Sequence, residues 1–407
     1  MRVLIVHNRY RSEMPSGENR VVDDDVEMLR DAGVEVDTYF RSSDEIEQFN
    51  QREKIGLAIR PLYSSEDAKR FSARLDEFRP DIVHLHNPFP LISPWVVRVA
   101  KRRGIPVVQT VHNYRHSCPA GTFLRHGKIC EDCSGKSIPW PAVVHGCYRD
   151  SRAQSTIMAA SARAHRSTWQ MVDRFLPVSE FVARKLEAAG VATHRIVVKP
   201  NAVVDPGPTM PVGSGFLFAG RLSDEKGIQL LLEAWSRSQL GHEVKLTIAG
   251  DGPERHLVAA ATSTVPGLVP VGHVSSEDVR RLMIETATVV VPSVCFEGLP
   301  TAILEAFAAG RPVVASRLGA SETLVTPDVG WLADPTPSSF AESLIAAYRT
   351  PVADCDRATR SRYERDFSPA AVTKALLAVY DELSAGWSEG GASRQTPEQK
   401  FLLGRRT

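Results

Sequence analysis

The sequence predicts an α/β protein that contains two doubly wound parallel sheets. Three observations support this fold class. Short apolar runs of the kind found in buried parallel strands alternate with helical patterns through most of the 407 residues. A stretch dense in Pro and Gly divides this alternation into two series. The length also suits two or three domains with substantial cores.

The first series of alternating elements occupies residues 1–199. It includes a long segment, 114–150, that has no regular patterning of its own. We therefore predict an N-terminal domain at 1–199 with a Cys-rich insert at 114–150. The expected strands are 2–7, 34–40, 81–86, 106–111 and 174–178, and the expected helices are 17–32, 94–103 and 151–172, with a charged helical region at 42–78.

The second series begins after residues 200–215, whose Pro and Gly content predicts a linker. A second domain is expected at 216–366, followed by a helix at 367–384. Residues 385–407 are rich in Gly, Ser and charged residues and predict a flexible tail. The expected strands of the second domain are 216–219, 244–249, 268–271, 288–292, 312–315 and 330–332.

The net charge of +1 conceals an uneven distribution of charge. Residues 1–200 contain 30 Lys and Arg against 24 Asp and Glu, and residues 82–175 contain 13 basic against 4 acidic side chains. Such a local excess suits an acidic or membrane-associated partner, although a solvated protein face is the default explanation. No recognised nucleic-acid motif accompanies the charge, so we expect no nucleic-acid partner.

No apolar run approaches the ~20 residues that a transmembrane helix needs. The apolar run at residues 1–7 is too short for a signal peptide and is interpreted as a strand. We therefore expect a cytoplasmic protein. The predicted helix 151–172 combines Arg152, Arg163 and Arg166 with apolar residues, which suggests peripheral contact with anionic lipid at the inner face of the membrane. A packed domain helix is the alternative.

Residues 294–316 contain the pattern around which the second series is organised. It consists of a turn after one apolar run, a helix that opens at Pro300, and a second apolar run. The first amides of a helix lack intrahelical partners, so they favour an anion. We therefore expect the backbone of Gly298 and Leu299 to bind a phosphate group.

Two carboxylates flank this expected phosphate site. Glu297 lies in the turn, and Glu305 lies about one and a half turns into the helix, where its side chain leans back toward the N-terminus. Carboxylates accept hydrogen bonds from hydroxyl groups and repel phosphates. A ligand with sugar hydroxyls on both sides of a diphosphate fits this arrangement, whereas a solvated helix face is the alternative.

A second polar pattern, Gly-Arg-Leu-Ser-Asp-Glu-Lys-Gly, occupies residues 220–227 directly after an apolar run. Arg221 can offer a planar fork of donors to phosphate oxygens, and Lys226 can offer a compact charge. Two cations directed at a departing diphosphate stabilise the charge that develops there and make a divalent metal unnecessary. The alternative is two solvated cations at a helix start.

Together the two patterns resemble the donor-site signature of the family 4 glycosyltransferases of the GT-B fold (glycosyl transferases group 1). The resembling features are Glu-x7-Glu with Gly-Leu-Pro after the first Glu, at 297–305, and Gly-Arg-Leu-x-x-x-Lys-Gly at 220–227. The resemblance extends to about residue 384. It implies two Rossmann-like domains that face each other across a cleft, the first on the acceptor side and the second on the nucleotide-sugar donor side.

The resemblance also implies an activity. This is the retaining, metal-independent transfer of a sugar from a UDP- or GDP-sugar to a hydroxyl of a glycan or a lipid-linked acceptor, in cell-surface polysaccharide or glycolipid biosynthesis. No cofactor is then required for catalysis. The same fold serves sugar-nucleotide epimerases, and a non-catalytic sugar-nucleotide binding protein would also contain two such domains.

The resemblance assigns roles to individual residues. Arg221 and Lys226 stabilise the leaving diphosphate, Glu297 holds the donor sugar, and His112 orients the sugar. No residue is an evident covalent nucleophile, so a same-face displacement is the expected mechanism. The expected donor-binding residues are Gly17, Gly252, Gly272, Gly298, Leu299 and Glu305, the last of which contacts the ribose. Ser16 departs from the Gly-Gly that usually precedes the first helix.

Four of the six cysteines lie in the insert: Cys118, Cys130, Cys133 and Cys147. Only Cys130 and Cys133 have the Cys-x2-Cys spacing that is typical of zinc sites. Three interpretations stay open. The four thiols hold a structural zinc ion, they are reduced and packed, or they form disulfides, which a cytoplasmic setting disfavours.

Overall fold

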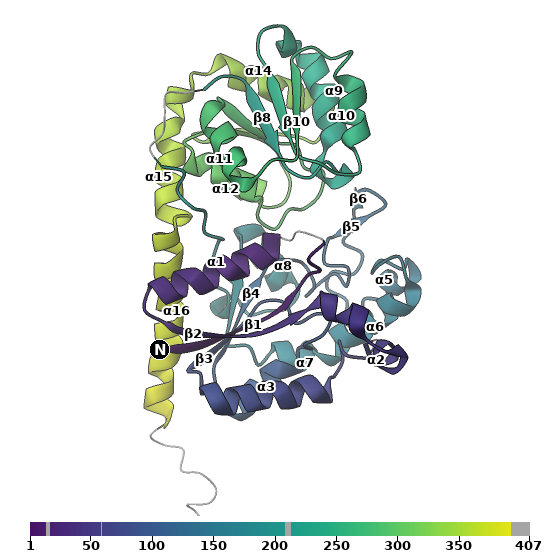
Figure 1. The fold of residues 1–407 in the computed structure, drawn as a ribbon, viewed down its shortest axis with the longest axis vertical. Coiled ribbons are helices and arrows are strands. Elements are labelled where there is room, and N and C mark those ends of the chain that lie inside the picture. Colours follow the sequence, from purple (N-terminus) through teal and green to yellow (C-terminus); the bar gives the residue numbers. More distant parts are fainter. Residues whose placement is uncertain (14–16, 58, 208–212, 392–407) are drawn as a thin grey trace, which may run out of the picture. The chain divides into compact units, whose positions relative to one another are not determined.

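The apolar runs of the N-terminal half form one sheet in the computed structural model, which describes residues 1–13, 17–57, 59–207 and 213–391 (Figure 1). The strand order is β2-β1-β3-β4-β7, and the β1/β2, β1/β3 and β3/β4 pairs are parallel. The strands are β1 (Arg2–Arg9), β2 (Glu35–Ser42), β3 (Ile82–Leu85), β4 (Val107–Val111) and β7 (Arg174–Pro177). Ser16, residues 208–212 of the predicted linker and residues 392–407 of the predicted tail lie outside the described residues.

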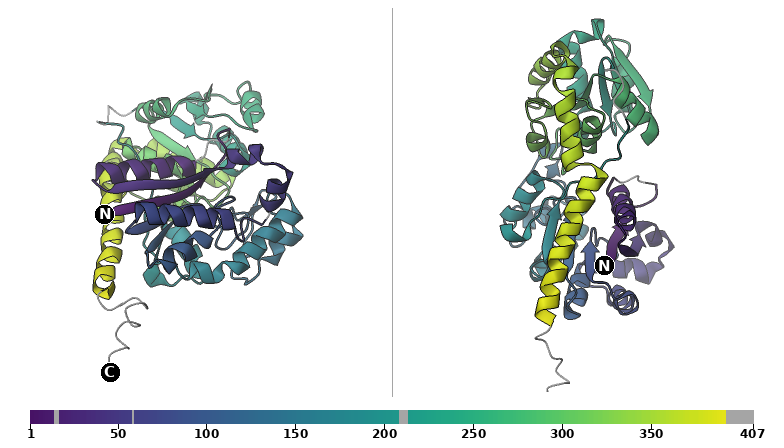
Figure 2. Two further views of the ribbon diagram at one scale, coloured as in Figure 1. Left: turned by 60° about the horizontal axis from the view of Figure 1, so that its bottom comes forward. Right: turned by 90° about the vertical axis from the view of Figure 1, so that its left-hand side faces the viewer.

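Helices cover both faces of this first sheet. Helices α1 (Gly17–Asp31) and α3 (Ser65–Phe78) lie on opposite sides of it (Figures 1 and 2). Because strands of the sheet are covered on both faces, β3 is buried at every residue, as a continuous apolar run predicts. The other helices of this half are α2 (Gln51–Leu57), α4 (Trp95–Arg102), α5 (Trp140–Val144), α6 (Arg152–Ala164), α7 (Arg166–Trp169) and α8 (Glu180–Ala188).

The second series forms a six-stranded parallel sheet with the order β10-β9-β8-β11-β12-β13. Its central strands β8 and β11 are neighbours, although β9 and β10 lie between them in the sequence. The strands are β8 (Phe216–Ala219), β9 (Leu246–Ala249), β10 (Leu268–Gly272), β11 (Thr288–Val291), β12 (Val313–Ser316) and β13 (Gly330–Ala333). The predicted fold class, with two parallel α/β sheets, is therefore confirmed.

Alternate residues of the second sheet enter a single hydrophobic core on one face. Phe216 and Phe218 of β8 pack there with Trp235 and Phe340, and the rings of Phe216 and Trp235 meet edge to face at 5.5 Å. Side chains alternate across a strand, so Leu217 of β8 points to the opposite face, where it is also fully buried. The helices are α9 (Ile228–Ser238), α10 (Arg255–Ala261), α11 (Ser276–Glu285), α12 (Thr301–Ala308), α13 (Ser321–Leu324), α14 (Pro337–Arg349), α15 (Asp356–Asp366) and α16 (Pro369–Gly391).

The chain divides into two compact units. The first contains Met1–Gln109, His165–Phe175 and the chain from Thr373, and the second contains Thr110–Ala164 and Leu176–Val372. The second unit therefore includes the Cys-rich insert and α8, which precede the predicted linker in sequence. The predicted domain boundaries at 199, 216 and 366 follow the chain order, and they stay a prediction.

Two segments differ from their predicted structure. The predicted helix 151–172 is interrupted at His165, which separates α6 from α7. The His165 ring is buried, and its Nε2 lies 2.8 Å from the carbonyl oxygen of Leu62, so a tertiary contact fixes the break. The insert was expected to lack regular structure, yet it contains an antiparallel hairpin of β5 (Leu124–Arg125) and β6 (Lys128–Ile129) as well as α5.

The C-terminal helix α16 belongs, from Thr373 onward, to the first unit. Its Tyr380 is fully buried, and the hydroxyl lies 2.6 Å from Nδ1 of His84 on β3. Burial raises the pKa of this hydroxyl well above its ordinary value, so the phenol stays protonated. The predicted helix at 367–384 exists and continues to Gly391.

Candidate active site

The candidate site is built on the loop between β11 and α12. Strand β11 is buried at every residue, and Pro300, with extended backbone, caps the helix that begins at Thr301. Helix α12 packs inward through Ile303, Leu304, Ala306 and Phe307. Glu305 is the single charged residue of the helix and lies half-buried among these apolar neighbours.

The Glu297 carboxylate is held from two directions. Nζ of Lys226 donates a hydrogen bond to one carboxylate oxygen at 2.8 Å, and the hydroxyl of Ser293 donates to the other. The Glu297 side chain is 13% exposed and the Lys226 side chain 33% exposed, so both can still reach a ligand. The structure thus brings together two of the predicted catalytic residues that lie 71 positions apart in the sequence.

The Lys226–Glu297 pair depends on close contact between two loops. Gly227 has a left-handed conformation, with φ of 73°, and a Cβ atom there would lie 2.0 Å from the carbonyl oxygen of Pro292. The amide of Val294 also donates to the carbonyl of Glu225 at 3.0 Å. Only glycine therefore allows the loop after β8 to approach the loop after β11.

The electrostatics of the pair favour a charged lysine. Partial burial lowers the pKa of Lys226, but the neighbouring Glu297 carboxylate raises it by more, so the net shift is upward. For Cys295, two residues before Glu297, the surroundings favour the neutral form of the side chain. Burial and then the Glu297 charge raise the pKa of this thiol to about 12. Cys295 is therefore a protonated thiol at neutral pH.

Three neighbouring loops at the ends of β8, β9 and β10 are joined by backbone hydrogen bonds. The amide of Leu222 donates to Asp251 at 2.9 Å, and the amide of Gly250 donates to Gly272 at 2.7 Å. A Cβ atom at Gly252 would lie 2.3 Å from the carbonyl oxygen of Leu222. Glycine at 252 thus permits close packing of the predicted donor loops, and Gly272 lies in the third of them.

Gly298 lies against the segment that contains His112. A Cβ atom at Gly298 would lie 2.9 Å from the carbonyl oxygen of His112, and the hydroxyl of Ser179 donates to the carbonyl of Gly298 at 2.6 Å. His112 directly follows β4 and is half-buried. The backbones of His112 and Gly298 are therefore in contact within the second unit. His112 is the residue predicted to orient the sugar, and Gly298 is predicted to bind phosphate.

The other predicted residues occupy separate positions. Arg221 is exposed where the chain leaves β8, and Leu299 is half-buried just before Pro300. Gly17 begins α1 in the first unit and has open space on its Cβ side. The donor roles of these residues, and that of Glu305 on the ribose, stay predictions.

Sequence reasoning missed several residues that support the site. Ser293 fixes one Glu297 oxygen, and Gly319 packs against the Glu297 backbone, where a Cβ atom would lie 2.9 Å from its nitrogen and its oxygen. The amide of Ala320 donates to the Glu297 carbonyl at 3.1 Å. A hydroxyl four residues before Glu297 was a usable signal for Ser293, whereas nothing local indicated the contact with 319–320.

The four insert cysteines are free thiols. Within the described ranges, which include all four, no three His, Cys, Asp or Glu side chains form a group that could hold a metal ion. Burial, followed by the charges of the other insert cysteines, raises the pKa of Cys133 to about 11, and burial also raises that of Cys147. The geometry favours reduced packed thiols and does not support the zinc or disulfide interpretations.

The predicted helix 151–172 and the neighbouring insert differ in their exposed apolar surface. Met158 and Ala159 of α6 are buried, which agrees with a packed domain helix, and the lipid contact of this helix stays a prediction. Large apolar side chains are exposed instead on and beside α5, at Ile138 (51%), Trp140 (57%) and Val144 (48%). Among the described residues, no helix is both long enough and apolar enough to cross a membrane.

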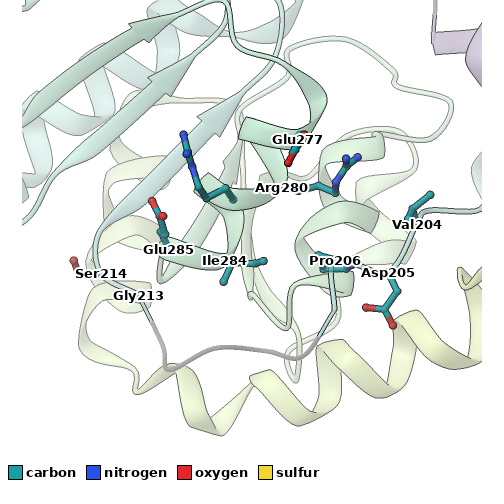
Figure 3. A pocket seen from close by; sticks show the side chains of 10 residues that line it. Val204, Asp205, Pro206, Gly213, Ser214, Glu277, Arg280, Ile284 and Glu285 are labelled. Atoms are coloured by element: carbon teal, nitrogen blue, oxygen red, sulfur yellow. The ribbon is translucent and has the colours of Figure 1, made fainter.

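A separate hollow of about 900 Å³ lies beside α11 (Figure 3). None of the predicted donor residues lines it. Residues from both ends of the predicted linker and from one side of α11 form its walls. The α11 residues are mostly charged. The lining residues are Val204, Asp205, Pro206, Gly213, Ser214, Glu277, Arg280, Arg281, Ile284 and Glu285. The candidate donor site is thus distinct from this hollow.

Two family models match the chain. The model described as "Glycosyl transferases group 1" matches residues 213–350, and the model described as "Glycosyl transferase 4-like domain" matches residues 16–202. The first match contains the loops that hold Lys226 and Glu297. The second match contains His112 and the Cys-rich insert.

Named relatives are similar over much of the chain. A phosphatidyl-myo-inositol mannosyltransferase of Mycobacterium leprae is 27% identical over 329 residues, which are 76% of this chain and 75% of the relative. The amylovoran biosynthesis glycosyltransferase AmsK of Erwinia amylovora is 28% identical over 316 residues, 72% and 74% of the two chains. A GDP-mannose-dependent alpha-mannosyltransferase of Corynebacterium glutamicum is 28% identical over 281 residues, 67% and 59% of the two chains.

Solved structures share the fold. The crystal structure of Anabaena HepE in complex with UDP-glucose matches with a TM-score of 0.62 over 94% of this chain and all of that chain. The sequence identity is 14%, so this likeness concerns the fold. It agrees with the arrangement of two parallel sheets described above.

Proposed function

Because the chain belongs to the glycosyl transferases of group 1 and has the GT-B fold, we propose that it transfers a sugar from a nucleotide diphosphate to a hydroxyl acceptor, with retention of configuration and without a metal ion. Transferase activity follows from the family. Retention, independence of metal, the donor, the acceptor and the residue roles form the proposal.

The observation that supports the proposal best is the hydrogen-bonded pair of Lys226 and Glu297. Breaking the bond between a sugar and a diphosphate develops negative charge on the departing phosphate, and a fixed cation stabilises that charge in the transition state. The raised pKa of Lys226 keeps this cation charged. The neighbouring carboxylate can accept hydrogen bonds from sugar hydroxyls, so the pair can bind both sides of the scissile bond.

The remaining residues complete the proposed mechanism. The exposed Arg221 offers a second cation to the diphosphate, and the amides of Gly298 and Leu299 offer donors at the start of α12. His112 orients the donor sugar, and Glu305 binds the ribose. We propose a same-face displacement, in which the leaving diphosphate accepts the proton of the incoming hydroxyl. Such a step needs no covalent nucleophile.

The proposed donor is a UDP- or GDP-sugar. One relative is named for its dependence on GDP-mannose, and a solved structure of the same fold holds UDP-glucose. Gly252 follows β9 and Gly272 ends β10, and we propose that their backbone approaches the nucleotide. A comparison of UDP- and GDP-sugars in the binding assay decides between uridine and guanosine.

The proposed acceptor is a hydroxyl of a glycan or of a lipid-linked sugar. Names among the relatives refer to phosphatidyl-myo-inositol and to amylovoran biosynthesis.

We also propose peripheral contact with an anionic membrane. Support comes from Ile138, Trp140 and Val144, which are exposed in the same stretch of sequence as the exposed basic residues Lys136 and Arg149. In a flotation assay, absence of binding to anionic vesicles would remove this contact and leave the transferase proposal intact.

The decisive experiment combines ligand screening with product analysis. We expect one nucleotide sugar, among UDP- and GDP-sugars, to raise the melting temperature more than its free nucleotide does. We further expect nucleotide release to depend on an added acceptor and to persist in EDTA. Release of nucleotide with an altered free sugar and no acceptor would identify an epimerase instead. Binding without any turnover would identify a sugar-nucleotide binding protein.

A further inference from the structure

The loop that contains Glu297 is joined to the Cys-rich insert by a cluster of aromatic rings. We call this cluster the aromatic clamp and define it as Phe123, Phe181 and Phe296 together with Lys185 and Glu131. The rings of Phe181 and Phe296 lie 4.9 Å apart, and those of Phe123 and Phe296 lie 6.3 Å apart in an edge-to-face arrangement. These distances are typical of favourable aromatic pairs.

Lys185 is the centre of the clamp. Its Nζ lies 5.4 Å from the ring centre of Phe123, 5.1 Å from that of Phe181 and 5.0 Å from that of Phe296. The same Nζ donates to the Glu131 carboxylate at 2.6 Å. Cation–π attraction strengthens as the site is desolvated, and the Lys185 side chain is only 18% exposed. One cation thus binds three rings and one carboxylate.

The clamp joins three segments of the second unit. Phe181 and Lys185 lie four residues apart on α8, so they share one face of that helix. Phe123 and Glu131 flank the β5–β6 hairpin of the insert, and Phe296 precedes Glu297 directly. The insert approaches the donor loops at a second point, because a Cβ atom at Gly127 would lie 2.9 Å from Oδ2 of Asp224.

The backbone of the Phe296–Glu297 segment also contacts residues 319–320. Gly319 packs against the Glu297 backbone and the Cα atom of Phe296, and the amide of Ala320 donates to the Glu297 carbonyl. The segment is therefore held by backbone contacts as well as by the aromatic clamp. Because Phe296 and Glu297 are consecutive residues, they share one short stretch of backbone, and contacts of the Phe296 ring restrict where this stretch can lie.

We propose that the Cys-rich insert positions Glu297 through the aromatic clamp and that Lys185 is a positioning residue for the donor sugar. This inference rests on the proposed function, because it assumes that Glu297 contacts the sugar. Misplacement of a binding group by about 1 Å can cost a hundredfold in rate. The nucleotide is expected to bind at the loops after β8, β9 and β10 and at α12. Loosening the clamp should therefore weaken binding of the sugar and spare the nucleotide.

The test measures dissociation constants by calorimetry for UDP, UDP-glucose, GDP and GDP-mannose. Lys185→Met removes the charge and keeps an apolar stem, and Lys185→Arg restores a cation. Glu131→Gln removes the ion pair with Lys185 by neutralising Glu131, which is the more exposed partner of the pair. We expect Lys185→Met to weaken binding of the recognised nucleotide sugar about tenfold, while the free nucleotide changes less than about twofold. Lys185→Arg should recover most of the loss, and Glu131→Gln should lie between.

Asp132→Asn is the matched control, because it removes a 2.9 Å ion pair with Arg125 in the same insert, outside the clamp. It should change neither constant. The inference would be overturned if Lys185→Met weakened binding of the nucleotide and of the nucleotide sugar equally. It would also be overturned if neither Lys185→Met nor Glu131→Gln weakened binding of the nucleotide sugar. Both outcomes would leave the proposed function intact. If the native protein bound none of the four ligands, the proposed function would fail, and the inference with it. Should Lys185→Met not fold, Glu131→Gln and Lys185→Arg decide.

Discussion

At the scale of single residues, the site depends on one cation and one carboxylate that neutralise each other. Lys226 and Glu297 lie on loops after two neighbouring strands, β8 and β11, and Gly227 permits the close approach of the first loop to the second. In the proposed complex, the diphosphate would compete with Glu297 for Lys226, and sugar hydroxyls would compete with Lys226 for Glu297. Binding would then replace the internal hydrogen bond of the pair with two contacts to the ligand.

The first prediction concerns the loss of either partner. Glu297→Ala and Lys226→Ala should each raise the activation free energy of transfer by at least about 2 kcal/mol, roughly a 30-fold loss of kcat/KM, because each removes a contact to developing charge or to the sugar. Steady-state kinetics with the recognised donor provide the measurement. Glu233→Ala on the exposed side of α9 is the control. Turnover close to that of the native enzyme in either site variant would contradict the assignment.

The second prediction concerns pH. The folded-state pKa of Lys226 is raised above its ordinary value of 10.5, so the stabilisation that the ion pair contributes is present below pH ~10.5 and is lost as the pH rises through the folded pKa. The difference in unfolding free energy between the native protein and Lys226→Met should therefore be constant from pH ~7 to ~10 and decline above. Urea unfolding at several pH values measures this difference. A decline that begins near neutral pH would refute the raised pKa.

At the scale of single elements, the Cys-rich insert combines a short hairpin and a short helix with irregular backbone, and it contacts two of the site loops. Its hairpin turn meets Asp224, and its Phe123 meets Phe296. Within the insert, the backbone amide of Cys130 donates to the carbonyl of Phe123, and the buried thiol of Cys133 donates to the carbonyl oxygen of Pro139 at 3.8 Å.

A third prediction follows for the thiols. Burial raises the pKa of Cys133 to about 11, and that of Cys295 is raised to about 12, so both should react slowly with iodoacetamide at pH ~7.5. The thiolate fraction rises about tenfold per pH unit below the pKa, and the labelling rate should follow it. Mass spectrometry of labelled peptides gives the rates. Fast labelling of Cys133 at neutral pH, or a stoichiometric zinc content in untagged protein, would contradict the packed-thiol interpretation.

The C-terminal helix gives a fourth prediction. Tyr380→Phe removes the hydroxyl that is hydrogen-bonded to Nδ1 of the buried His84. The loss should destabilise the protein by about 1–3 kcal/mol, because a buried polar atom loses its partner. Chemical denaturation measures the change. Tyr348→Phe, which removes an exposed hydrogen bond to Glu243, is the matched control and should cost at most about 0.5 kcal/mol. Equal effects would show that α16 does not depend on this contact.

At the scale of the whole molecule, the chain contains two parallel sheets of the GT-B type, and the residues of the proposed donor site that pair with each other lie in its second unit. A ligand that binds only the folded state stabilises it by mass action. The Lys226–Glu297 pair and the glycine-rich loops all belong to this unit, so nucleotide-sugar binding should be detectable without an acceptor.

The fifth prediction is therefore one of ligand linkage. The recognised nucleotide sugar, at a concentration of about 100 times its dissociation constant, should add about 2.7 kcal/mol to the stability of the folded state. Differential scanning calorimetry with and without ligand measures the effect. EDTA should leave it unchanged, because no metal takes part in the proposed binding. A shift that disappears in EDTA would contradict metal independence, and the free sugar alone should produce none.

The amino-acid sequence was enough to predict the fold class and the order of most strands and helices. Apolar periodicity is a local property, and buried parallel strands appear as continuous apolar runs whatever lies around them. The loops that hold Lys226 and Glu297 could be predicted for the same reason, because each follows such a run and parallel sheets bind ligands at the carboxyl ends of their strands. The roles of the two residues came from the resemblance to the glycosyltransferase family, and they stay a prediction.

The contacts among these residues, and those of the insert with the site loops, could be seen only in the folded structure. The pairing of Lys226 with Glu297 requires β8 and β11 to be neighbours, and the aromatic clamp requires Phe123, Lys185 and Phe296 to meet from three separate segments. Likewise, the break at His165 arises from a contact with Leu62, more than a hundred residues away. Tertiary contacts depend on how the whole chain folds, so local sequence patterns do not predict them.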